Sequence, residues 1–82
     1  MMSAKEMFEK LGYELYSDNE NRLRYVRKFH TKHYPDYIEV EFLKFNKSFV
    51  VNHVWDDTEN ANFVKMSLYK AIQQQLKELE WI

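Results

Sequence analysis

Apolar side chains recur with two different periods along this 82-residue chain, and the change of period separates helices from strands. Near the start, Ala4, Met7, Phe8 and Leu11 are spaced by three or four residues. Side chains with this spacing lie on one side of a helix, so that an amphipathic helix buries all four together. The pattern therefore predicts a first helix over residues 4–11.

Both ends of this helix carry recognisable signals. Ser3 precedes the helix and Glu6 follows three positions later, which is the spacing of a capping box. Gly12, the only glycine in the chain, follows the last apolar position, where helices commonly end in a residue with positive φ. We therefore expect a short helix that is fixed at both ends.

The middle of the chain alternates between apolar and polar residues, as strands with one buried face do. The predicted strands are, in order, 13–16, 22–30, 37–45 and 48–55. Turn residues separate them at 17–21 and 31–36, and Asn46-Lys47 is a plausible two-residue hairpin turn. These short connections predict that neighbouring strands pair in an antiparallel arrangement.

A second helix ends the chain, and its apolar stripe runs from Val64 to Leu79. The pattern leaves open where this helix begins. Thr58 or Asn60 could cap it, or residues 61–64 could run extended before it. The order is then α-β-β-β-β-α, a single α+β domain over residues 1–82 with a three- to four-stranded antiparallel meander. We expect two layers with both helices on one sheet face, and the alternative is one helix on each face.

Residues 22–34, RLRYVRKFHTKHY, carry five Lys or Arg and no acid, with aromatic residues between them. Such a run is typical of a platform for single-stranded nucleic acid. The whole chain, however, has 12 basic and 13 acidic side chains and a net charge of −1, whereas nucleic-acid-binding domains are usually basic overall. The run therefore has to be judged from its neighbours in the sheet.

Strand pairing offers a second explanation of the basic run. A register that keeps the apolar faces together gives the pairs Glu14–Arg24, Lys28–Glu39 and Phe42–Val51. A slip of two residues would instead place Arg24 opposite Glu41. In each case basic residues face acids, and such cross-strand pairs contribute roughly 0.2–1 kcal/mol each. We therefore expect a charge-paired open face more than a nucleic-acid platform.

The same register predicts an apolar patch on the face opposite the helices, formed by Val26, Leu43, Phe45, Val50 and Val54. Contiguous exposed apolar surface usually marks a contact with a partner or a second copy. We expect a non-enzymatic protein-interaction module that self-associates or binds a host or phage protein through this patch, in which charged side chains set register and specificity: Arg22, Arg24, Lys28, Glu39 and Glu41. The alternative is nucleic-acid binding through strand 22–34, with these basic and stacking groups: Arg22, Arg24, Arg27, Lys28, Lys32, Tyr25, Phe29 and Tyr34.

Other chemistry finds little support in the sequence. No Cys is present, and His30, His33 and His53 do not have the spacing of a metal site. One glycine cannot form a phosphate-binding loop, and no serine lies in a nucleophile motif, so we expect no cofactor and no enzymatic activity. No apolar run approaches the roughly 18 residues of a membrane span, and the start lacks the apolar stretch of a signal peptide. A soluble cytoplasmic protein is expected.

Two segments carry a resemblance: AKEMFEKLGY at 4–13 and AIQQQLKELEW at 71–81. In them the chain resembles small proteins encoded by phages and prophages of Gram-positive bacteria. The resemblance implies a mobile-element context, in which small α+β proteins often bind host or phage proteins, and no activity or functional residue is carried over. Glu80 stands where this group has Gly, which would let the helix continue through the tail, and Lys65 stands where a Thr-type cap is expected.

Overall fold

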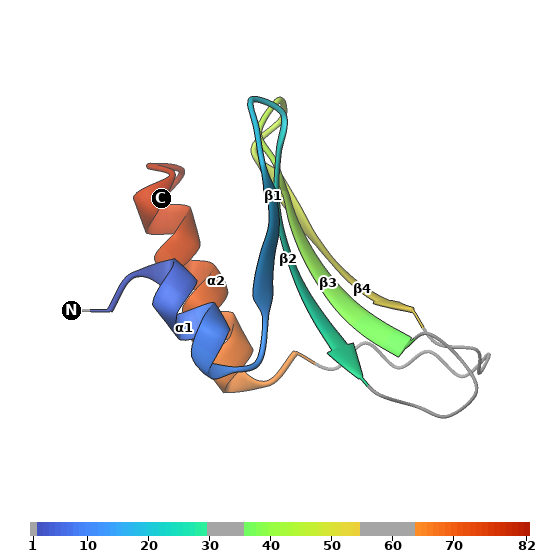
Figure 1. Ribbon diagram of the computed structural model, residues 1–82. Coiled ribbons are helices and arrows are strands. Elements are labelled where there is room, and N and C mark those ends of the chain that lie inside the picture. The colour runs from blue at the N-terminus through green and yellow to red at the C-terminus, as the bar shows by residue number, and fades with distance from the viewer. Residues whose placement is uncertain (1, 30–35, 55–63) are drawn as a thin grey trace.

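The computed structural model describes residues 2–29, 36–54 and 64–82, which form two helices and four strands in the predicted order (Figure 1). The elements are α1 (Ala4–Lys10), β1 (Glu14–Asp18), β2 (Arg22–Phe29), β3 (Asp36–Leu43), β4 (Ser48–Val54) and α2 (Met66–Glu78). The strands pair in antiparallel fashion in the order β1-β2-β3-β4, as a meander. The predicted α+β fold is thereby confirmed.

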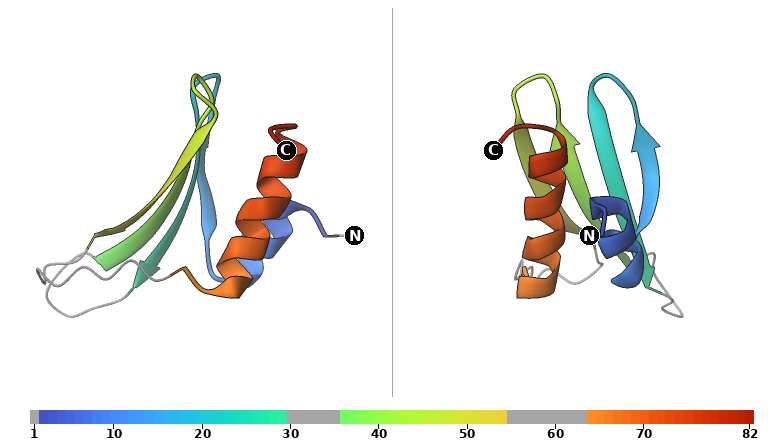
Figure 2. Two further views of the ribbon diagram at one scale, coloured as in Figure 1. Left: turned by 180° about the vertical axis from the view of Figure 1, so that it is seen from behind. Right: turned by 90° about the vertical axis from the view of Figure 1, so that its left-hand side faces the viewer.

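Both helices lie on the same face of the sheet (Figures 1 and 2). Seen from the helix side, α1 lies in front of β1 and β2, and α2 lies in front of β3 and β4 (Figure 2, right). The prediction of two layers is therefore confirmed, and the alternative of one helix on each face is wrong. The strands bend away from the helices toward one end, so that the helix-covered face is convex and the open face is concave (Figure 1).

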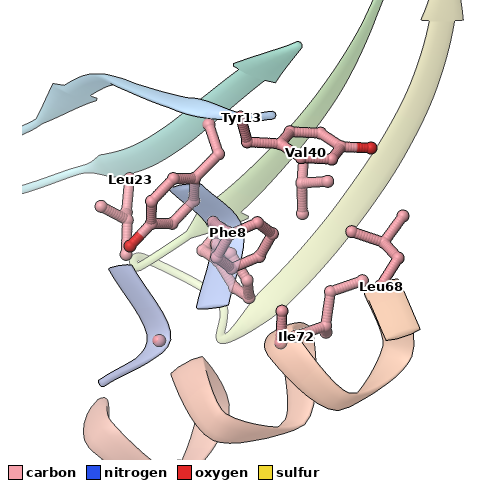
Figure 3. Close-up of a cluster of buried hydrophobic side chains, with 10 residues drawn as sticks. Phe8, Tyr13, Leu23, Val40, Leu68 and Ile72 are labelled. Atoms are coloured by element: carbon pink, nitrogen blue, oxygen red, sulfur yellow. The ribbon is translucent and has the colours of Figure 1, made fainter. Parts of the chain in front are cut away.

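The core lies between the helices and the convex sheet face (Figure 3). Phe8 of α1 is fully buried at its centre, and its ring stacks on Tyr25 of β2 with centroids 3.9 Å apart and an interplanar angle of 12°. Val40 and Phe42 of β3 are also fully buried. These are the strand residues that alternation assigns to the helix-covered face, so the predicted faces of β2 and β3 are correct.

Two polar contacts fix α2 within this arrangement. The Tyr25 hydroxyl donates a buried hydrogen bond of 2.7 Å to Gln75 Oε1, which joins β2 to α2. The backbone N–H of Ala4 donates a 2.7 Å bond to Glu78 Oε2. Because Ala4 is the first residue of α1, the Glu78 carboxylate satisfies an N–H that has no partner within the helix, at the end where the helix dipole favours negative charge.

The ends of α1 match the sequence signals. The Ser3 hydroxyl accepts a hydrogen bond from the Glu6 N–H at 3.2 Å, and the Glu6 carboxylate accepts one from the Ser3 N–H at 3.3 Å, which completes the predicted capping box. Gly12 has φ of 92°, and the Tyr13 N–H bonds back to the Phe8 carbonyl at 2.9 Å. This is a Schellman motif, which turns the chain from α1 into β1.

The end of α2 corrects one expectation. Helix α2 stops at Glu78, and Glu80 takes φ of 59°, with the Trp81 N–H bonded to the Leu76 carbonyl at 3.0 Å. Glu80 therefore takes the conformation that Gly12 takes after α1, and the expectation that the helix continues through the tail is wrong. The left-handed conformation carries a steric cost for a residue with a Cβ, which the motif's hydrogen bonds and the packing of Trp81 on Phe42 offset.

Glu80→Gly is expected to stabilise the protein by about 0.5–1 kcal/mol, because glycine has no Cβ to strain a positive φ, although it also gains freedom in the unfolded chain. Lys77→Gly is the matched control, because Lys77 lies within α2, three residues before Glu80, and this substitution should destabilise the protein by about 1 kcal/mol. Urea unfolding of both variants measures the difference. Destabilisation by both substitutions would contradict the strain assigned to Glu80.

The start of α2 is capped differently from the prediction. The N-cap is Lys65, which makes no side-chain capping bond. Thr58 and Asn60 lie outside the described residues and are not the cap. Val64 precedes the helix and is exposed, so the part of the apolar stripe that packs in the core begins at Leu68.

The registers of β2–β3 and β3–β4 each differ by two residues from the predicted ones, as does that of β1–β2 before its bulge; beyond the bulge, where Ser17 pairs with Arg24, the difference is three. Glu14 opposes Val26 instead of Arg24. Arg24 opposes Glu41, which is the alternative that a slip of two residues gives. Phe42 opposes Phe49 and not Val51. A shift of two positions leaves every side chain on its face, so the apolar pattern did not distinguish these registers.

Turn geometry decides the register between β3 and β4. The connection is a four-residue turn, 44–47, in place of the predicted two-residue turn at Asn46-Lys47. A two-residue type I′ turn requires positive φ at both central positions, which favours glycine. Here only Lys47 takes positive φ, at 54°, and the longer turn shifts the pairing by two residues.

Candidate functional site

The open face does not expose the predicted apolar patch as one surface. Val26 is only 6% exposed and Leu43 is half-buried, whereas Val50 is 36% exposed and Phe45, in the turn after β3, is 70% exposed. The side chain of Val54 lies outside the described part of the chain. The structure therefore places the accessible apolar groups at the β3–β4 turn, and Val26 apart from them.

Val26 lies in the hollow of the concave face. It opposes Glu14 of β1 on one side and Glu39 of β3 on the other. A shallow pocket of about 340 Å³ lies over this part of the sheet, and its lining residues are Gly12, Glu14, Tyr16, Val26 and Lys28. Lys28 opposes Tyr37 on β3 and not the predicted Glu39, so it lines this pocket instead of completing a cross-strand ion pair.

A cluster of four charged side chains, here called the charge cluster, occupies the middle of the open face: Arg22, Arg24, Glu39 and Glu41. Arg24 Nη2 donates to Glu39 Oε2 at 2.7 Å, and its Nε lies 3.9 Å from Glu41 Oε2. Arg22 Nε lies 3.3 Å from Glu41 Oε1. Glu39 is buried although it is charged, because Arg24 covers and pairs with it.

Tyr16 covers Arg24 from β1. A bulge between Leu15 and Ser17 interrupts the β1–β2 register, and the Arg24 guanidinium lies 4.8 Å from the centroid of the Tyr16 ring. This is a cation–π contact, which adds to the ion pair below it. Sequence reasoning missed Tyr16, since a single extra residue in a strand leaves no signal in the alternation of so short a segment.

The two carboxylates of the charge cluster do not ionise alike. Burial opposes ionisation of Glu39, but the hydrogen bonds from Arg24 and from Glu41, with the charges of Arg24 and Arg22, outweigh it and lower the pKa of Glu39. The hydrogen bond to Glu39 and burial raise the pKa of Glu41 above its ordinary value, against the attraction of Arg22. The hydrogen bond to Glu39 likewise raises the pKa of Arg24. Glu39 is therefore the firm partner of Arg24, and Glu41 takes up a proton first as the pH falls.

The basic run is divided between the two faces of the sheet. Arg22 and Arg24 are paired with acids, and Arg27 opposes Ile38 on the helix-covered face. Tyr25 is buried in the core and cannot stack on a base. Lys32 and Tyr34, and the side chain of Phe29, lie outside the described residues. The described part of the run thus does not present the arginine and aromatic surface that a nucleic-acid platform needs.

Within residues 2–29, 36–54 and 64–82, no three His, Asp or Glu side chains form a group that could hold a metal ion. His30 and His33 lie outside this part of the chain, and His53 lies on the helix-covered face, opposite Ile38. None of the described helices is both long and apolar enough to cross a membrane.

Comparison of the chain with protein-family models, with curated proteins and with solved structures found no match. The resemblance of the two ends to phage and prophage proteins therefore stays a prediction. The function is inferred from the geometry of this chain.

Proposed function

We propose that this chain is a non-enzymatic protein-interaction module that binds another protein through its open sheet face. One observation carries the proposal: both helices cover the same side of the sheet, so no described helix covers the other side (Figures 1 and 2). A concave sheet face that bears exposed apolar groups is the kind of surface that a partner covers.

The open face offers two kinds of contact. Phe45 and Val50 supply apolar surface near the β3–β4 turn, where a partner could bury an aromatic anchor. The charge cluster lies beside them and is partly buried already. Because Arg24 and Glu39 already form an ion pair with each other, we expect the cluster to orient a partner and to discriminate between partners more than to add affinity.

Capture with a matched pair of variants tests the proposal. The immobilised protein is exposed to a lysate of a Gram-positive bacterium, the context that the resemblance predicts, and bound proteins are identified by mass spectrometry. Phe45→Glu should abolish capture of a specific protein, because it places a charge in the exposed apolar turn beside the open face. Lys5→Glu on the exposed side of α1 should leave capture unchanged.

High salt and nuclease treatment distinguish protein binding from the alternative, nucleic-acid binding. Capture through apolar contacts should persist in high salt and after nuclease treatment, whereas contacts with phosphates weaken steeply with salt. A bound species that is lost on nuclease treatment would contradict the proposal and favour the basic run. Equal capture by wild type and Phe45→Glu would place the partner on another surface.

A further inference from the structure

The two edges of the sheet differ in how they are protected. An edge strand exposes unpaired backbone N–H and C=O groups, and proteins commonly block such edges with bulges and charged side chains. Edge strand β1 has both devices, because it contains the bulge beside Leu15 and the acids Glu14 and Asp18. Its edge is therefore poorly suited to pairing with another strand.

Strand β4 has neither device. Its seven residues, SFVVNHV, include no Asp, Glu, Lys, Arg or Pro, and its register with β3 is regular from Ser48 to Val54. Within the described part of the chain, β4 has a paired neighbour on one side only. Among the described residues it is thus a regular, uncharged edge strand whose outer side has no paired strand.

Exposed apolar side chains gather at the same edge. Phe49 of β4, on the helix-covered face, is 43% exposed even though its ring lies 6.0 Å from that of Phe42. Tyr69 of α2 is 45% exposed. Tyr69 and Glu78 are nine positions apart, which is two and a half helical turns, so their side chains lie on opposite sides of α2. Because Glu78 contacts α1, Tyr69 points away from α1. Since α2 lies in front of β3 and β4, that direction is toward the β4 edge (Figure 2, right).

We propose that two copies of this chain associate by antiparallel pairing of β4 with β4, which joins their sheets into one of eight strands. In a symmetric dimer, the two paired strands have the same sequence. A charged residue near the middle of the strand would then lie close to the same charge on the other copy, which is unfavourable. β4 carries no Asp, Glu, Lys or Arg, so no symmetric register produces such repulsion. A twofold axis perpendicular to the sheet keeps both α2 helices on the same side, where Phe49 and Tyr69 lie next to the junction.

This association pairs the backbone edge of β4, whereas the proposed function uses side chains of the open face, so neither depends on the other; Val50 belongs to both regions, and Phe45 only to the second. The open faces of the two copies would become one continuous surface, while Phe45 at the turn stays outside the junction. The variant that tests partner capture, Phe45→Glu, should therefore leave association intact.

Sedimentation and light scattering over a range of concentrations test the proposal. Wild type should approach twice the chain mass of 10.1 kDa as concentration rises. Val50→Lys places a lysine at the middle of β4 in each copy and should weaken association by roughly tenfold or more. Leu15→Lys, at an exposed position of the β1 edge, is the matched control and should associate as wild type does, as should Phe45→Glu.

Amide hydrogen exchange of the wild-type protein supplies a readout that needs no variant. Backbone amides of β4 should become more protected as concentration rises, whereas those of β1 should not change. A monomer at every concentration would overturn the proposal. So would a dimer that Val50→Lys leaves intact, one that Leu15→Lys or Phe45→Glu disrupts, or one without concentration-dependent protection in β4.

Discussion

Phe8→Ala is expected to lower the free energy of unfolding by about 3–5 kcal/mol, the usual cost of truncating a fully buried phenylalanine. Phe8 is the one large, fully buried side chain of α1, and its ring contacts Tyr25, Tyr13 and Phe42. Since α1 has only seven residues, it is too short to be stable without this packing. A domain of this size is stable by roughly 5 kcal/mol or little more, so the variant should retain only about 0–2 kcal/mol and be partly unfolded near room temperature.

Phe45→Ala is the control for that variant. It removes the same aromatic ring from an exposed position and should change stability by no more than about 0.5 kcal/mol. Urea denaturation followed by circular dichroism compares the two variants. A Phe8→Ala protein as stable as wild type would contradict the central place of this ring in the core.

Glu39→Gln is expected to destabilise the protein at neutral pH by about 1–3 kcal/mol, because it leaves the partly buried Arg24 guanidinium without its charged acceptor. Glu41→Gln should cost less than about 1 kcal/mol, because Glu41 is the carboxyl whose ionisation the neighbouring Glu39 opposes. The two variants remove the same charge from neighbouring positions of one face. Equal losses would contradict the assignment of Glu39 as the firm partner of Arg24.

The dependence of stability on pH tests the same assignment of the two carboxylates. The lowered pKa of Glu39 contributes stability that is present above the ordinary glutamate pKa of 4.5 and is lost as the pH falls through its folded value. The raised pKa of Glu41 contributes stability that is present below 4.5 and is lost as the pH rises through its folded value. Between pH 7 and pH 4, Glu41→Gln should therefore lose more stability than wild type, because it removes the carboxyl whose pKa is raised and keeps the one whose pKa is lowered. Denaturation at a series of pH values measures both slopes.

Much of the architecture was predictable because it depends on local patterns. The stripe through Phe8, the Ser3 capping box and the position of Gly12 define α1 and its turn into β1. Alternation assigned Tyr25 and Phe42 to the buried face, since a slip by one residue would expose the whole set. Each of these features is decided by residues close together in the sequence.

The strand registers and the exposure of side chains on the open face were harder to predict from the sequence. A slip of two residues preserves alternation, so the turn between β3 and β4 and the bulge in β1 decide the pairing through backbone geometry. Val26 is buried although it lies on the open face, because alternation predicts the face of a side chain but not how far its neighbours cover it. For the same reason the apolar patch predicted for the open face is reduced to its accessible end at Phe45 and Val50.

Site-specific photo-crosslinking in bacterial cells that produce the protein tests the central claim, that the open face binds a protein, most directly. A photoreactive amino acid at position 45 lies in the exposed β3–β4 turn beside the open face, and one at position 5 lies on the exposed side of α1. The account predicts that position 45 gives a discrete protein adduct and that position 5 does not. Adducts formed only from position 5, or from neither position, would contradict the account.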